Sequence, residues 1–70
     1  MKNRIIAIAS EILGENVTEA TSMDNFLKWD SLKTLQIIMA LDNECISVPL
    51  EKIAKIKSIK DLIEFSEHGN

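Results

Sequence analysis

The sequence has few of the residues from which catalytic and metal sites are usually built. Its 70 residues include one cysteine, one histidine, two glycines and one proline, and no tyrosine. A single cysteine excludes an intramolecular disulfide, and one histidine with one cysteine cannot supply the usual zinc ligands. Gly14 and Gly69 are too far apart to form a phosphate-binding glycine loop. These shortages argue against an enzyme that works alone and against a resident metal.

Two further shortages limit the partners and the location of the protein. The chain has 8 basic and 11 acidic residues, for a formal charge of −3, whereas nucleic-acid binding needs a basic face. No apolar run approaches the roughly 18 residues that a membrane-spanning helix needs. We therefore expect a cytoplasmic monomer that binds neither nucleic acids nor membranes.

The chain is rich in isoleucine, and its apolar residues recur at intervals of three and four. This spacing is typical of helices and not of strands. It predicts an all-α domain spanning residues 1–70, with three main helices, one short helix and a long loop after the first helix. The expected helices cover residues 2–13, 31–44, 50–55 and 59–66, and residues 67–70 are expected to fray.

Signals at the expected helix ends support these bounds. Gly14 is placed where a helix often ends in a left-handed residue. Asp30 is a good N-cap for the second helix, and Pro49 suits the start of a short third one. Ser58 and Asp61 have the spacing of a capping box before the last helix, with aspartate in place of the usual glutamate or glutamine.

The same spacing predicts which helix faces are buried. The first helix should bury one stripe, formed by Ile5, Ile8, Ala9, Ile12 and Leu13. The second should bury an arc so broad that other helices surround it, formed by Leu32, Leu35, Ile38, Met39, Leu41 and Cys45. Asp42 falls inside this arc without an evident reason.

Residues 15–30 form a connection that is long for a compact domain, which indicates either function or local packing. Phe26, Leu27 and Trp29 stand near its end, and we expect them to hold the loop against the core. Trp29 has two interpretations: it packs and steadies the start of the next helix, or it is an exposed anchor for a partner.

The loop leads into Asp30-Ser31-Leu32, which places a serine at a helix N-terminus. Free backbone N–H groups and the positive end of the helix dipole make this a favourable position for a phosphate group. However, aspartate followed by serine is also one of the commonest ways to cap a helix, so the tripeptide alone does not decide between these roles.

The wider pattern resembles the acyl carrier proteins and the related peptidyl carrier domains. In that family, Asp-Ser-Leu is followed by an apolar helix, which Asp30-Ser31-Leu32 and residues 35–41 match. Ile46-Ser47-Val48-Pro49 matches the family's Ile-x-Val/Ile-Pro turn, and Ile56-Lys57-Ser58-Ile59 matches the motif before its last helix. The order and spacing of these pieces carry the resemblance. It implies an acyl-carrier-like four-helix bundle.

The resemblance implies a carrier and not an enzyme. Ser31 would bear a covalent 4′-phosphopantetheine arm, whose thiol holds an acyl or aminoacyl group as a thioester. Asp30 would lie beside the magnesium ion of the modifying enzyme, and Leu32 at the edge of the partner contact. The implied partners are a phosphopantetheinyl transferase, an acyl- or aminoacyl-activating ligase, and a downstream acyltransferase or synthase.

The sequence departs from the familiar members of the family at positions that bear on partner recognition. Well-known members have acidic residues two and five positions after the serine, where this chain has Lys33 and Gln36. They also have a glycine shortly before the aspartate, whereas here Trp29 stands directly before Asp30. The usually acidic segment 46–60 holds four lysines and one glutamate. Charge complementarity governs partner choice, so we expect Trp29, Lys33, Gln36 and Met39 to take part in partner recognition.

These departures favour a specialised pathway over bulk fatty acid synthesis. Polyketide synthesis, nonribosomal peptide synthesis and the modification of a surface sugar are the candidate pathways. The alternative is a carrier-like helical interaction module that is never modified.

Overall fold

Four helices make up the protein: α1 (Lys2–Leu13), α2 (Ser31–Asn43), α3 (Leu50–Ile53) and α4 (Ile59–His68). The computed structural model describes the backbone of residues 2–68 and the side chains of residues 2–66. Within that range the only β-type pairing is one isolated bridge between Ser22 and Ser58. The prediction of an all-α bundle is confirmed. None of the described helices is long and apolar enough to cross a membrane.

The helix ends differ from the predicted ones by one or two residues. Helix α2 ends one residue early, at Asn43, and α3 ends two residues early, at Ile53. Helix α4 ends two residues later than predicted, at His68. Gly69 and Asn70 lie outside the described residues.

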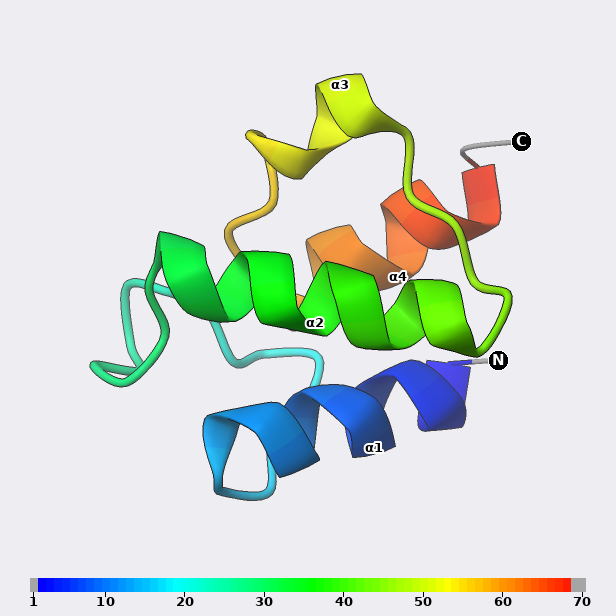
Figure 1. Ribbon diagram of the computed structural model, residues 1–70. Helices are drawn as coiled ribbons and strands as arrows, with labels where there is room; N and C mark the ends of the chain where they lie inside the picture. Colours follow the sequence, from blue (N-terminus) through cyan, green and yellow to red (C-terminus); the bar gives the residue numbers. More distant parts are fainter. Residues whose placement is uncertain (1, 69–70) are drawn as a thin grey trace.

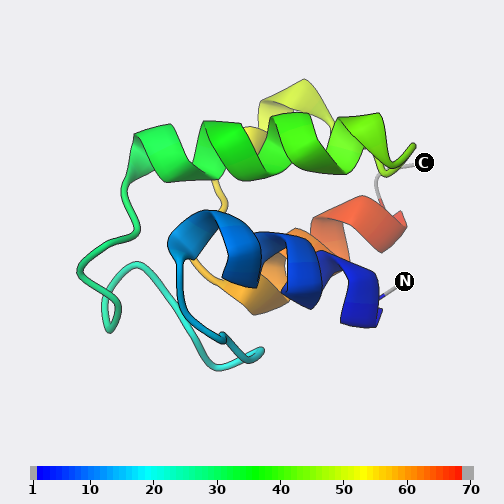
Figure 2. The same ribbon diagram turned by 60° about the horizontal axis from the view of Figure 1, so that its bottom comes forward.

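The core lies where α1, α2 and α4 meet. Helix α1 contacts both α2 and α4, while α3 contacts α2 (Figures 1 and 2). The largest fully buried side chains come from these three main helices: Ile5, Ile37, Leu41, Ile59 and Leu62. The short α3 contributes no buried residue of its own. The hydrophobic core therefore depends on three helices, and α3 covers one edge of it.

The predicted stripe of α1 is largely confirmed. Ile5, Ile8, Ala9 and Leu13 are buried, while Ile12 is only half-buried.

The predicted arc of α2 is confirmed for Leu41, which is buried, and for Ile38, which is half-buried, but it is wrong for Leu32, Leu35 and Met39. Leu32, Leu35 and Met39 are 61%, 49% and 67% exposed, whereas Ile37 and Leu41 are fully buried. The physical reason is that α1 covers one side of α2, while the four-residue α3 is too short to cover the other. Apolar spacing alone cannot show which of two apolar sides finds a partner.

The end of α2 shows two further differences from the prediction. Cys45 is exposed and not buried, because the chain has already left the helix there with a positive φ of 64°. Asp42 is exposed as well, so its carboxylate lies in solvent and needs no buried partner.

The long loop is tied to the start of α4 by two backbone hydrogen bonds. The Met23 N–H donates to the Lys57 carbonyl at 2.8 Å, and the Ile59 N–H donates to the Thr21 carbonyl at 2.9 Å. Near the end of the loop, Trp29 is buried and Phe26 is half-buried, but Leu27 is fully exposed. The expected packing of the loop is therefore confirmed for two of its three large apolar residues.

The predicted helix-end signals form, with one change. Gly14 adopts a left-handed φ of 80°, and its N–H donates to the Ser10 carbonyl at 2.9 Å. The Ser58 hydroxyl accepts from the Asp61 N–H at 3.1 Å, as a capping box requires. The Asp61 carboxylate, however, accepts from the N–H of Lys57, not from that of Ser58.

Replacing Gly14 should test the left-handed end of α1. A Cβ at this position would meet no atom within 4 Å, so Gly14→Ala should suffer only from the unfavourable backbone angle. We expect the free energy of unfolding to fall by about 1 kcal/mol. Gly14→Asn should lose less, because asparagine tolerates this conformation. Urea unfolding followed by circular dichroism measures both, and equal losses would contradict the backbone explanation.

Candidate functional site

Ser31 is the first residue of α2 and is exposed. Asp30 precedes it with an extended backbone, and its carboxylate accepts a hydrogen bond from the Lys33 N–H at 2.9 Å. Its carbonyl accepts from the Thr34 N–H at 3.1 Å. Asp30 thus caps the helix as predicted, and the adjacent serine is held at the positive end of the helix dipole.

A buried hydrogen-bond chain fixes the position of this helix start. The indole N–H of Trp29 donates to the Thr34 hydroxyl at 2.7 Å, and that hydroxyl donates to the Asp30 carbonyl at 3.3 Å. Trp29 and Thr34 are only 3% and 5% exposed. This geometry supports the packing interpretation of Trp29 and excludes the exposed anchor.

The apolar spacing of α2 did not predict a role for Thr34, because that spacing takes no account of hydrogen-bonding side chains. A signal was present: a threonine four residues after the cap can return its hydroxyl to the cap carbonyl. The same spacing places Thr34 beside Ile37 and Leu41 on the buried side of α2.

A cavity of about 490 Å³ opens beside Ser31, between α2 and the segment that contains α3. Most of its walls are apolar, and Ser31, Thr34 and Lys57 are the polar residues that line it. The lining residues are Met23, Ser31, Thr34, Leu35, Leu50, Ile53, Ala54, Ile56 and Lys57. A group attached to Ser31 therefore has an apolar recess next to its point of attachment.

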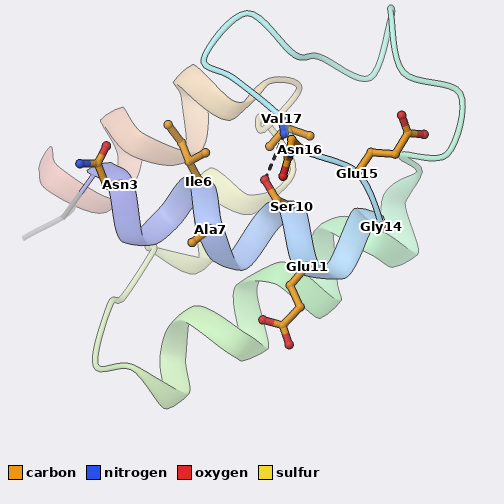
Figure 3. Close-up of a pocket in the computed structure, with 9 residues that line it drawn as sticks. All are labelled: Asn3, Ile6, Ala7, Ser10, Glu11, Gly14, Glu15, Asn16 and Val17. Atoms are coloured by element: carbon orange, nitrogen blue, oxygen red, sulfur yellow. Dashed lines mark hydrogen bonds between the residues drawn. The ribbon is translucent and has the colours of Figure 1, made fainter.

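A second cavity, about 800 Å³ in volume, lies along α1 and the beginning of the long loop (Figure 3). It includes Ser10, but that hydroxyl already accepts a hydrogen bond from the Val17 N–H at 3.1 Å. This groove is open and contains none of the predicted site residues. Among the residues that the structure describes, no group of three or more His, Cys, Asp or Glu side chains could hold a metal ion.

Three of the four residues predicted for partner recognition are accessible on α2, whereas Trp29 is buried. Gln36 and Met39 are exposed on α2, and Lys33 is half-buried. Helical geometry places Leu32, Gln36 and Met39 on the outward side of the helix, opposite Ile37 and Leu41. Trp29 is absent from this surface and can influence partners only through the helix start that it positions.

Comparison with known proteins adds a direct finding to this geometry. The sequence pattern of the family described as the phosphopantetheine attachment site matches residues 3–66. The chain belongs to this family. It is 30% identical over 69 residues to the acyl carrier proteins of Rickettsia canadensis (strain McKiel) and Rickettsia rickettsii (strain Iowa), with 93% of this chain and 80% of theirs covered. The acyl carrier protein of Rickettsia massiliae (strain Mtu5) matches to the same extent.

Membership in the acyl carrier family confirms three predictions. The protein is a carrier and not a catalyst, and its prosthetic group is a covalently attached 4′-phosphopantetheine. The resemblance inferred from the order and spacing of the motifs is correct. The described structure agrees with such a group, because an exposed hydroxyl at a helix N-terminus, beside an apolar cavity, offers both an attachment point and space.

The hydrogen-bond chain that positions Ser31 can be tested with a double-mutant cycle. Thr34→Val leaves the buried Trp29 N–H without an acceptor, so we expect a loss of about 1–3 kcal/mol in the free energy of unfolding. In a Trp29→Phe background the same change should cost about 1 kcal/mol less, because no donor is left unpaired. Urea unfolding by circular dichroism reads all four proteins. Equal costs in the two backgrounds would show that the hydrogen bond does not couple these residues.

Proposed function

We propose that this carrier holds an acyl or aminoacyl group as a thioester on an arm attached to Ser31, and that it serves a specialised biosynthetic pathway in the cytoplasm. The observation that carries the proposal is the position of Ser31. It is an exposed serine at the capped N-terminus of α2, with an apolar-walled cavity beside it.

Three of the five other serines fit attachment less well than Ser31 does. These three use their hydroxyls within the fold. Ser10 accepts from the Val17 N–H, Ser58 caps α4, and the buried Ser66 donates to the Ile63 carbonyl at 2.9 Å. Ser31 is not needed as a cap, because Asp30 performs that role. Its hydroxyl is therefore available to become the ester oxygen of a phosphodiester.

Each neighbouring residue has a defined part in this scheme. The N-terminus of α2 favours the negative charge of a phosphodiester at Ser31. Asp30 keeps its carboxylate exposed while it caps the helix, which suits its expected place beside the magnesium ion of a transferase. When bound, the arm supplies the thiol that carries the cargo. The protein presents that arm, and its partners perform the chemistry.

The specialised role is supported by the residues on the exposed side of α2. Lys33 and Gln36 stand where the familiar carriers have acidic residues, and the outward side of the helix is mainly apolar. Apart from Asp30, partners that dock through basic patches would find no acidic residue on α2 before Asp42. A set of partners adapted to this surface is the more consistent interpretation.

Intact mass spectrometry tests the attachment site. Incubation with coenzyme A and a broad-specificity phosphopantetheinyl transferase should add the mass of one phosphopantetheine group. Ser31→Ala should abolish the gain, while Ser47→Ala, which alters another exposed serine, should leave it intact. Absence of any gain would favour the unmodified interaction module, and a gain on Ser31→Ala would show attachment elsewhere.

The cargo distinguishes a specialised pathway from fatty acid synthesis. We expect the protein purified from its native cells to carry one acyl or aminoacyl group, visible as a single added mass beyond the arm. A carrier for bulk fatty acid synthesis would instead show a ladder of masses spaced by two-carbon units. Mass spectrometry of the arm released from Ser31 makes the distinction, and such a ladder would overturn the specialised role.

A further inference from the structure

The exposed side of α2 and the start of α3 form one apolar surface. Leu32, Leu35 and Met39 follow one another along α2 at helical spacing, and Leu50 of the neighbouring α3 is 84% exposed. Leu35 and Leu50 also line the same cavity, so the two helices present them at one place. Large apolar side chains that gather on a surface in this way mark an interaction site more often than isolated ones do.

The charges around this apolar surface are distributed unevenly. Lys55 and Lys57 are exposed in the turn after α3, and Lys57 lines the cavity together with Ser31. Figure 1 shows the segment after α3 returning towards the N-terminal end of α2. The exposed acidic residues Asp42 and Glu44 stand at the opposite end of that helix. The end of α2 that bears Ser31 therefore has these two lysines near it, together with Asp30, whose carboxylate caps the helix.

These lysines are available to a partner. The ion pairs among the described side chains, residues 2–66, join Lys2 to Glu19, Arg4 to Glu44 and Lys28 to Glu15. Neither Lys55 nor Lys57 takes part in them. A partner's carboxylates could therefore pair with these lysines without displacing an acid of this chain.

We propose that Leu32, Leu35, Met39 and Leu50, with Lys55 and Lys57, form a docking surface for an enzyme whose own surface has an apolar centre and acidic residues facing the Ser31 end. The inference rests on the proposed function, because it concerns enzymes that act on a group held at Ser31. Charge complementarity selects this partner. A basic docking surface would place like charges against Lys55 and Lys57 at the point where the arm must enter.

Two synthetic amphipathic peptides provide a defined probe of this chemistry. They share one leucine face, and the flanks of that face carry glutamates in one peptide and lysines in the other. In an NMR titration of the unmodified protein, the glutamate peptide should shift the amides of α2, α3 and residues 54–57. It should bind about fivefold more tightly than the lysine peptide at low salt. The difference should shrink as salt is added, because exposed charges are screened.

Two charge-reversal variants test whether Lys55 and Lys57 determine the preference between the two peptides. Lys55→Glu with Lys57→Glu should reverse the preference, so that the lysine peptide binds more tightly. Lys2→Glu with Arg4→Glu makes the same change in net charge on α1 and should preserve the original preference. Circular dichroism confirms that each variant is folded, and a Leu35→Ser variant should weaken both peptides because it removes part of the apolar centre.

Three results would overturn the proposal: equal affinity for the two peptides, a preference that K55E/K57E does not change, or shifts confined to the groove along α1. The titration uses unmodified protein and does not involve phosphopantetheine. Its failure would therefore leave the mass gain at Ser31 unaffected, and a missing mass gain would leave the peptide preference standing.

Discussion

The buried hydrogen-bond chain from Trp29 through Thr34 to Asp30 is the constraint on which the site depends. It joins the last part of a long loop to the first turn of α2, so the position at which the loop ends and the helix begins is determined by interior contacts. A serine on an exposed helix end would otherwise share the mobility of a fraying terminus. Here the residue on its N-terminal side caps the helix, and the residue before that is buried. The position of Ser31 is thus fixed by both of its preceding residues.

The shortness of α3 explains the other functional feature. If α3 had the length of an ordinary helix, it would bury the second apolar side of α2 and complete a closed bundle. With only four residues and no buried side chain, α3 leaves that side open and leaves a cavity beneath itself. The surface that partners can contact and the recess beside Ser31 therefore have the same origin. Helix α2 therefore leaves part of its apolar area unburied, and this area belongs to the proposed docking surface.

The sequence predicted the helices well because their ends carry specific chemistry. Gly14, Asp30 and Ser58 each act where their types predicted. The orientation of α2 could not be predicted in this way, because its apolar residues lie on two sides and spacing does not say which side finds a neighbour. That choice depends on the length of α3, which ends two residues before its predicted end.

The candidate site likewise contains residues that the sequence predicted and one contact that it did not. Asp30, Ser31 and Leu32 were identified from a local motif, and their placement at the start of α2 matches the expectation. Thr34 was missed, because its partner is Trp29, five positions earlier and on the other side of the helix start. Buried polar contacts of this kind depend on the path of the chain between the two residues, and a local motif does not report that path.

The two hydrogen bonds between the long loop and the start of α4 have a consequence for the shape of the recess beside Ser31. One of them joins Met23 directly to Lys57, and both of these residues line the recess. Leu50 and Ile53 belong to a segment with few buried contacts, and such segments move at the lowest cost in free energy. The wall of the recess that contains Met23 and Lys57 is therefore held by a backbone hydrogen bond, while the wall that α3 contributes can move more easily. A change in the width of the recess can come from displacement of α3, with α2 left in place.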